Sequence, residues 1–321
     1  MLKYGNTIIK TAGGAWTNRS VDPYNPLNLP PFTIRTRWTA GTTPTISGVT
    51  GAVVTQVSAD PNVWDITYEN TVWLKLLRGQ LKLLEVLGAN TSGVTLMGSG
   101  SPSGGALFLD CNNLERVALF DTSSVTDMGY MFASSTSSRS NTKLTTIPLF
   151  DTSRVTNMTS MFNGCTALTT VPLLDTSGLT SPASTSAAYR MFRNCTSLTS
   201  VPLFNLSGTY STREMFYGCT SLTSVPLFNL SGTNSTREMF YGCTALTSVP
   251  LFDLSSSTNT YRMFFGCTAV ESGALALYTQ TSTQTTPPTT YSGMFTDCGR
   301  DTTTGAAELA QIPTSWGGTM S

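Results

Sequence analysis

Residues 215–228 read Met-Phe-Tyr-Gly-Cys-Thr-Ser-Leu-Thr-Ser-Val-Pro-Leu-Phe, and residues 239–252 repeat them with one difference, Ala245 in place of Ser221. The dipeptide Met-Phe recurs at 131, 161, 191, 215, 239, 263 and 294, after a degenerate Leu107-Phe108. The intervals are 24, 30, 30, 24, 24, 24 and 31 residues. A 24-residue unit with insertions of six or seven explains every interval. That length is typical of leucine-rich repeats, so we expect an α/β solenoid with one coil per unit.

Each unit is expected to pair a strand with a short helix. The strand pattern Leu-x-x-Val/Ile-Pro-Leu-Phe starts at Leu114, Leu144, Leu168, Leu198, Leu222 and Leu246, with weaker copies at Leu83, Val270 and Leu309. These starts predict about nine coils over residues 81–316. The proline in the pattern cannot donate to a ladder, so the sheet should be narrow there. The side chains expected inside one coil are Met215, Phe216, Cys219, Leu222, Val225 and Leu227.

The Met-Phe segment is predicted to be the helix. Four residues before the Met, six of seven units have a good N-cap, and the residues in order are Asp127, Asn157, Ala187, Ser211, Ser235, Asn259 and Thr290. The spacings Ser211-x-x-Glu214 and Ser235-x-x-Glu238 match a capping box. Three residues after the Met, or its equivalent, stand residues that tolerate a left-handed helix end: Asp110, Gly164, Asn194, Gly218, Gly242, Gly266 and Asp297.

The cysteines all occupy one position, four residues after the Met or its equivalent: Cys111, Cys165, Cys195, Cys219, Cys243, Cys267 and Cys298. We expect a ladder of buried thiols that act as small apolar side chains. A zinc site is disfavoured because the sequence has no histidine and no Cys-x-x-Cys pair. Disulfides between neighbouring coils are also disfavoured, since stacked side chains lie about 4.8 Å apart and bridged Cβ atoms about 3.8 Å apart.

Residues 150–168, Phe-Asp-Thr-Ser-Arg-Val-Thr-Asn-Met-Thr-Ser-Met-Phe-Asn-Gly-Cys-Thr-Ala-Leu, closely resemble the repeat of BspA-like leucine-rich-repeat surface proteins, which occur in mycoplasmas, Bacteroides and some phages. The resemblance covers roughly 230 residues and implies a solenoid on a cell or virion surface. From Leu206 onward the Asp-Thr-Ser-x-Val-Thr-x-Met half of the repeat is replaced by Leu-Ser-Gly-Thr-x-Ser-Thr-Arg-Glu-Met. No secretory leader or cell-wall anchor is evident, which favours a virion protein over an anchored adhesin.

Residues 1–80 lack the repeat and are predicted to form a small β-rich capping or attachment module. Turns are expected at Asn25-Pro26 and Pro30-Pro31, and strands over 32–38 and 49–57. Residues 317–321 are expected to be a C-terminal tail. A β-rich module that opens directly on a short solenoid resembles fibre or appendage proteins of phages that infect gut Bacteroidales.

Composition restricts the function. The chain has 18 basic and 18 acidic residues, and charged residues are 11% of it, so nothing points to nucleic acid. No uncharged apolar run reaches the roughly 18 residues needed to cross a bilayer. The absence of histidine removes Ser-His and Cys-His nucleophile systems, and a repeat surface offers no obvious cleft. We therefore expect no catalytic residues, no metal and no cofactor.

Tyrosines and arginines recur on the expected helix face as i, i+4 pairs: Tyr189/Arg193, Arg213/Tyr217, Arg237/Tyr241 and Tyr261/Phe265. They either pack locally or form a stripe that binds glycans, since aromatic faces suit sugar rings and guanidinium groups suit anions. Ser/Thr-rich insertions at 98–105, 133–143 and 178–188 could bind partners or simply be solvated.

These features predict a non-enzymatic phage virion surface protein, a tail or head fibre subunit. Its N-terminal module would bind other virion proteins, and its solenoid would bind a host cell-surface glycan or protein. Homo-oligomers are expected, as for fibres. A bacterial secreted or surface adhesin and a purely structural capsid decoration protein are the alternatives.

Overall fold

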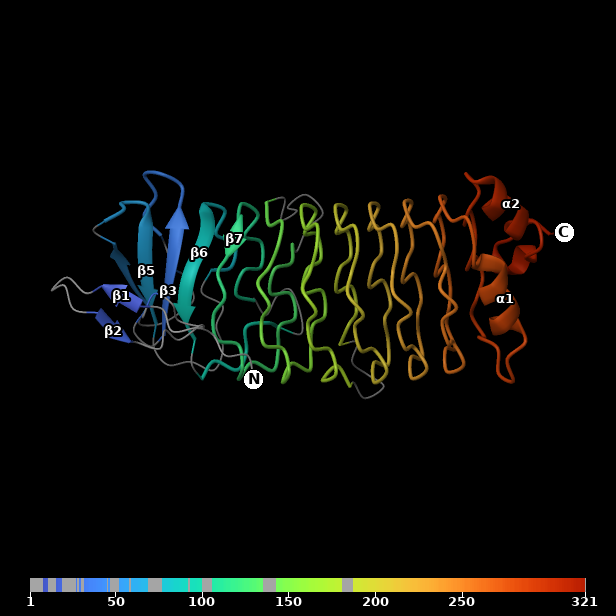
Figure 1. The fold of residues 1–321 in the computed structure, drawn as a ribbon, viewed down its shortest axis with the longest axis horizontal. Coiled ribbons are helices and arrows are strands. Elements are labelled where there is room, and N and C mark those ends of the chain that lie inside the picture. Colours follow the sequence, from blue (N-terminus) through green and yellow to red (C-terminus); the bar gives the residue numbers. More distant parts are fainter. Residues whose placement is uncertain are drawn as a thin grey trace.

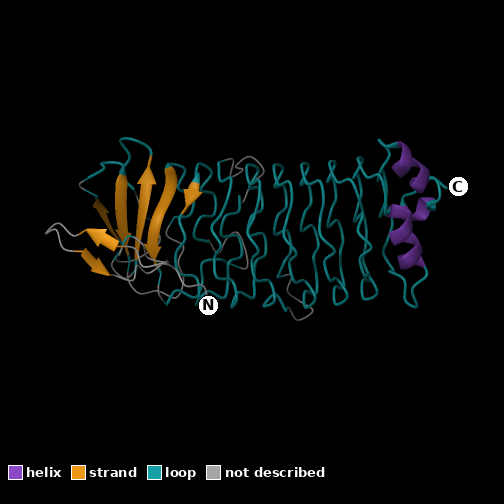
Figure 2. Cartoon of the chain, viewed as in Figure 1, coloured by secondary structure: helices purple, strands orange, loops and turns teal. Residues whose placement is uncertain are grey.

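The computed structural model describes residues 8–10, 16–18, 27, 29, 32–44, 46, 52–57, 59–68, 77–91, 93–99, 106–134, 143–180 and 187–320. The chain is a stack of coils with strands at its N-terminal end and helices at its C-terminal end (Figure 1). The coils between them contain almost no regular helix or strand (Figure 2). The interior of the stack is one continuous hydrophobic core that runs from Ile34 to Trp316.

The N-terminal end of the stack is covered by a sheet with strand order β4-β5-β3-β6-β7. Its strands are β3 (Thr33–Trp38), β4 (Val53–Gln56), β5 (Val63–Thr67), β6 (Leu83–Asn90) and β7 (Arg116–Val117). A separate antiparallel pair is formed by β1 (Ile8–Lys10) and β2 (Trp16–Asn18). Strand β6 belongs to the first coil; it pairs antiparallel with β3 and parallel with β7. The β-rich module therefore shares one sheet with the first coil of the solenoid.

The C-terminal end of the stack is covered by α1 (Ala274–Ser282), α2 (Thr303–Leu309) and the 3-10 helix η1 (Thr314–Trp316). The strand expected to start at Leu309 is wrong, because Leu309 is the last residue of α2. The expected tail is also wrong for the residues described: the Thr319 N–H donates to the Leu309 carbonyl at 2.9 Å, and the Met320 N–H to Ile312 at 3.1 Å. These residues close the end of the core.

The predicted helix at Met-Phe is wrong. The residue before the Met has a left-handed backbone, with φ of 56° at Arg190 and 54° at Glu214, which a helix does not allow. The segment is instead a run of overlapping turns in which N–H groups alternate between two directions. The Met215 N–H donates within its coil to Thr212, whereas the Phe216 N–H donates to the next coil, to the Met239 carbonyl at 2.9 Å. The Met-Phe segments thus form the main hydrogen-bonded ladder between coils.

The residues expected to be N-caps begin these turns. In four of them, Asp127, Asn157, Ser211 and Asn259, the side chain accepts from the N–H two residues later, as when Asn157 Oδ1 accepts from Thr159 at 3.0 Å. Isolated parallel bridges link Ser211 to Ser235 and Ser235 to Asn259 in successive coils. The expected left-handed positions after the Met-Phe segment are confirmed, with φ of 71° at Gly218, for example.

The Leu-x-x-Val-Pro-Leu-Phe segments are not regular strands beyond β6 and β7 in the part of the chain described. One residue per coil bonds to the coil before it, as when the Thr223 N–H donates to Thr199 at 3.2 Å. Pro226 then accepts from the N–H of Phe228 at 2.9 Å in a tight turn, and this turn shifts the alternation of side chains. Phe228 is buried and Leu227 is 60% exposed, so the expected burial of Leu227 is wrong.

Two columns of phenylalanine rings fill the stack. The Met-Phe column continues through Phe192, Phe216 and Phe240 with centroids 5.5 Å apart. The Pro-Leu-Phe column continues through Phe204, Phe228 and Phe252 with centroids 6.3 and 6.2 Å apart. Coils therefore lie closer on the hydrogen-bonded side than on the proline side.

Several sequence-based expectations lie outside the described residues. They are the turns at Asn25-Pro26 and Pro30-Pro31, the first part of the 49–57 strand, and most of the insertions at 98–105, 133–143 and 178–188. The strand expected at 32–38 is confirmed as β3.

Candidate functional site

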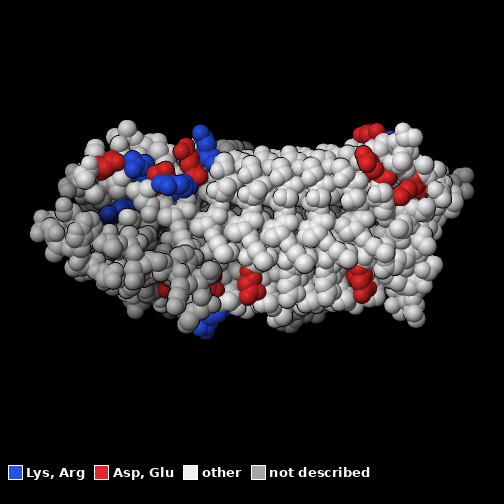
Figure 3. Space-filling view, viewed as in Figure 1, with Lys and Arg blue, Asp and Glu red and all other residues white. Residues whose placement is uncertain are grey.

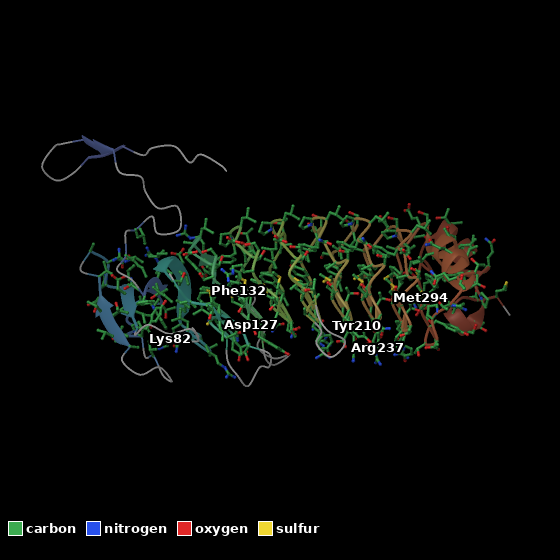
Figure 4. The ribbon with its side chains drawn as sticks, turned by 90° about the horizontal axis from the view of Figure 1, so that it is seen from below. Lys82, Asp127, Phe132, Tyr210, Arg237 and Met294 are labelled. Carbon is green, nitrogen blue, oxygen red and sulfur yellow. The ribbon has the colours of Figure 1, made fainter. Side chains whose placement is uncertain are left out.

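The candidate site is a half-buried surface on the hydrogen-bonded side of the stack, built from three positions per coil: two residues before the Met, one before it and two after it. We call it the arginine–aromatic face. It spans four coils and consists of Tyr189, Arg190, Arg193, Arg213, Glu214, Tyr217, Arg237, Glu238, Tyr241, Tyr261, Arg262 and Phe265. Arg237 lies at the edge of the stack, whereas Phe132 lies inside it (Figure 4).

The positions two residues after the Met form a column of stacked rings. Tyr217 and Tyr241 are 4.6 Å apart at 2°, and Tyr241 and Phe265 are 4.8 Å apart at 2°. The guanidinium of Arg193 covers the Tyr217 ring at 4.7 Å, and that of Arg262 lies over the Phe265 ring at 5.1 Å. Because the rings stack on one another and arginines lie over the two outer rings, little ring face is left for stacking a sugar.

The positions two residues before the Met form a second column, in which arginines stand between tyrosines. The Arg213 guanidinium lies 5.5 Å from the Tyr189 ring centroid, and that of Arg237 lies 5.1 Å from the Tyr261 ring. Burial raises the pKa of Tyr189. Tyr189 therefore stays neutral at physiological pH, and both rings lie against guanidinium groups.

Glu214 joins three of the arginines, and its side chain is only 5% exposed. Its carboxylate accepts from Arg190 Nε at 2.8 Å and Arg213 Nε at 3.1 Å. It also accepts from Arg193 Nε at 3.1 Å. Burial opposes the ionisation of this carboxyl, but the three guanidinium groups outweigh it and lower the pKa of Glu214. Glu214 is therefore ionised and fixes the arginines in place.

The rest of the face carries excess positive charge. Glu238 accepts only from Arg237, at 3.2 Å, and Arg262 contacts rings but has no carboxylate partner among the described residues. The face thus contains five arginines and two glutamates. A guanidinium has five N–H donors, and the ion pairs in this face use at most two on each arginine.

The residues predicted from the sequence do gather on one surface, but not as i, i+4 pairs on a helix. Arg193 covers Tyr217 of the next coil, and Arg213 covers Tyr189 of the previous one. The prediction missed Arg190, Glu214, Glu238 and Arg262, because it treated the residue before the Met as part of a helix. Glu214 and Glu238 occur at one repeat position between Arg and Met, and that coincidence was the available signal.

The cysteines lie inside the stack on the other side of the Met-Phe ladder. All seven are buried and unbridged. Each Sγ whose contact is resolved points at a carbonyl of an earlier coil, as Cys219 does at Phe192, 3.1 Å away. Burial raises the pKa of Cys219 to about 12, so the thiolate does not form at neutral pH.

No metal-binding cluster of His, Cys, Asp or Glu side chains occurs among the described residues. In the same residues, none of the helices has the length and apolar character needed to cross a membrane. The site therefore offers guanidinium donors and tyrosine edges, with one buried carboxylate that the arginines already hold.

The fold and the repeat define the class of protein: a leucine-rich-repeat solenoid. Residues 105–225 match the family described as "Mycoplasma protein of unknown function, DUF285". Residues 179–283 match "BspA type Leucine rich repeat region (6 copies)". The two matches together cover more than half of the chain. The chain belongs to the BspA-like leucine-rich-repeat family.

One solved structure with some similarity is a leucine-rich repeat protein from Eubacterium ventriosum, with 17% identity and a TM-score of 0.35 over 60% of this chain. The match spans 58% of that protein's length. No curated protein sequence matches the chain.

Proposed function

We propose that this chain is a non-enzymatic surface protein whose arginine–aromatic face binds an anionic polysaccharide on a host cell. The observation that carries the proposal is the excess of arginines on a rigid face: Arg193, Arg213, Arg237 and Arg262 are held by rings and by two carboxylates at a spacing set by the coils. Guanidinium groups held in this way bind sulfate, phosphate or carboxylate groups with little loss of side-chain entropy.

The ligand is expected to be charged rather than neutral. A neutral sugar would need an open ring face, and in this face the rings of Tyr217, Tyr241 and Phe265 stack on each other. A chain of anionic groups can instead run along the columns and contact one guanidinium per coil. The binding energy would then grow with the number of coils contacted.

The test compares dextran sulfate with unmodified dextran by isothermal titration calorimetry. We expect binding to dextran sulfate alone, weakened at least tenfold in the Arg213→Gln/Arg237→Gln variant, as for two hot-spot arginines of roughly 1 kcal/mol or more each. The charge-matched control is Arg154→Gln/Arg300→Gln, which removes two exposed arginines from other parts of the surface. Equal weakening in both variants, or equal binding of dextran, would refute the proposal.

We further propose that the chain is displayed on a phage virion as a tail or head fibre subunit and that its N-terminal sheet attaches it to other virion proteins. The support is the resemblance to the BspA-like repeat combined with strand β4 at the outer edge of the sheet, where Val53 is 58% exposed. An edge strand of this kind can pair with a strand of another chain. A bacterial surface adhesin and a capsid decoration protein remain the alternatives.

Immunogold electron microscopy with antibodies to residues 187–320 separates these three locations. Label on phage tails or head fibres supports the proposal, and label on bacterial cells supports the adhesin. Host adsorption in the presence of excess purified protein then distinguishes receptor binding from decoration, because a decoration protein would not compete.

A further inference from the structure

A second surface, separate from the arginine–aromatic face, consists of five leucines on the proline side of the stack. They occupy the position after the proline in five successive coils, and they are Leu149, Leu173, Leu203, Leu227 and Leu251. Their exposed fractions are 59%, 60%, 60%, 60% and 53%. We call this set the leucine column. Five large apolar side chains in one line form the kind of contiguous patch that monomers seldom expose without a partner.

The exposure of the leucine column results from a tight turn that is present at Pro148, Pro226 and Pro250. The tight turns at Pro226 and Pro250 direct Phe228 and Phe252 inward and leave the intervening leucine outside. Among the described residues, the Leu203, Leu227 and Leu251 N–H groups have no backbone acceptor in a neighbouring coil. The column is therefore a regular feature of the repeat and not a local irregularity.

The surroundings of the column are polar but almost uncharged. On one side lie exposed Thr and Ser residues such as Thr223 and Ser224. On the other side lies a line of exposed or half-buried acidic and amide residues: Asp151, Asp175, Asn205, Asn229 and Asp253. The view from the side of β6 and β7 shows the middle coils without Lys or Arg and with only a few acidic groups along one edge (Figure 3). The middle of the column therefore offers a polyanion no basic side chain to bind.

We propose that the leucine column is the interface with a second copy of this chain. The argument is one of spacing. The five leucines repeat with the coil, whose rings in this layer are 6.2 and 6.3 Å apart, and a partner must present apolar groups at the same interval over five coils. A second copy has the same interval because it has the same coils. In an isologous two-fold dimer, each leucine of the column therefore meets a leucine of the second copy.

The charges indicate that the two copies run in the same direction. If the two-fold axis runs along the leucine column, coil faces identical coil and the acidic line of each copy lies opposite the Thr and Ser line of the other. If the copies ran in opposite directions about Leu203, Asp151 would approach Asp253 of the second copy. Like charges that face each other across an interface are unfavourable, so the parallel arrangement is preferred, and it places both N-terminal sheets at one end.

The buried area is sufficient for a stable dimer only when the Thr and Ser line and the acidic and amide line beside the leucine column are also part of the interface. A standard interface buries roughly 800 Å² on each partner, which is more than five leucine side chains supply. Beyond Leu251 the apolar surface continues into an open depression of about 760 Å³ beside α1, lined by Leu275 and Ala276 among others. The leucines would form the apolar centre of the interface, and the Ser, Thr and Asn side chains its polar rim.

The test is sedimentation equilibrium of the full chain at micromolar concentrations. We expect a dimer, and the Leu203→Asp/Leu227→Asp variant should raise the dimer dissociation constant at least thirtyfold, because two central apolar contacts become charged. The matched control is Leu81→Asp, which changes a 46% exposed leucine outside the column. Circular dichroism checks that each variant is folded. A monomeric wild-type chain, or a dimer that the double variant leaves intact, would overturn the proposal.

Orientation is tested with Leu251→Cys under mild oxidation. In the parallel dimer the two Cys side chains face each other and form a disulfide-linked dimer, whereas in the antiparallel dimer they lie at opposite ends and do not. The native cysteines do not interfere, because all seven are buried. The Leu→Asp changes lie outside the arginine–aromatic face, so loss of the dimer and loss of dextran sulfate binding are separate outcomes.

Discussion

Replacing Glu214 by Gln tests how the arginine–aromatic face is held together. The substitution keeps the size of the side chain and removes the charge that three arginines share. Breaking a fully buried ion pair costs about 3 to 5 kcal/mol, and an exposed pair contributes at most about 1 kcal/mol. Glu214 is 5% exposed and its partners are 28 to 39% exposed. We therefore expect a loss of about 2 kcal/mol in the free energy of unfolding, between the two limits.

The matched comparison is Glu238→Gln, which occupies the same position one coil later. Glu238 is 12% exposed and, among the described residues, pairs with Arg237 alone, so the loss should stay below about 1 kcal/mol. Urea titration followed by circular dichroism measures both values. Equal losses in the two variants would refute the account of Glu214 as the residue that organises the face.

The same reasoning gives a pH dependence. The pKa of Glu214 is lower in the folded chain than in the unfolded chain, so its stabilising contribution is fully present above the unfolded value of about 4.3. The contribution is lost as the pH falls through the lowered folded value. The difference in stability between wild type and Glu214→Gln should therefore be constant near neutral pH and shrink below about pH 4. A difference that grew on acidification would contradict this sign.

Two further substitutions or treatments test the interior. Phe216 is fully buried and stacks on Phe192 and Phe240 at 5.5 Å. Phe216→Ala should therefore lower the free energy of unfolding, measured by urea titration, by about 4 kcal/mol. A loss under about 1 kcal/mol would show that the ring column does not support the stack. The seven thiols are buried, so a thiol reagent at neutral pH should label none of them quickly and all of them after denaturation; rapid labelling of several in the native protein would disprove the thiol ladder.

The sequence predicts much of the fold because the repeat carries strong local signals. The Met-Phe period, the glycines such as Gly218 and the single cysteine position indicate a stacked core. The left-handed backbone at Arg190 and Glu214 could not be predicted, since charged side chains carry no signal for positive φ. The sequence favoured a helix there because the residue types that cap helices also begin other kinds of turn, and the two cannot be told apart from the sequence.

The candidate site was predicted in part for the same reason. Tyr217 and Arg237 were expected on one surface by their spacing, but their partners lie in neighbouring coils, and contacts between coils depend on which N–H groups form the ladder. The exposure of Leu227 was missed because a period of two across Val-Pro-Leu-Phe places Leu227 inside. The tight turn at Pro226 shifts that period by one residue, and only the three-dimensional structure reveals the turn.

Both proposed surfaces depend on one claim, that the coils are hydrogen-bonded to each other mainly along the Met-Phe side and that the leucine-column amides make no such bonds. Native-state hydrogen exchange read by NMR at single residues tests it directly. The Phe192, Phe216 and Phe240 amides, each bonded to a Met carbonyl at 2.9 Å in the next coil, should be protected to near the global stability of the stack. The Leu251 amide and the amides at the two substituted positions should exchange quickly in the monomeric Leu203→Asp/Leu227→Asp variant. Strong protection of the leucine-column amides, or fast exchange along the Met-Phe side, would contradict the account.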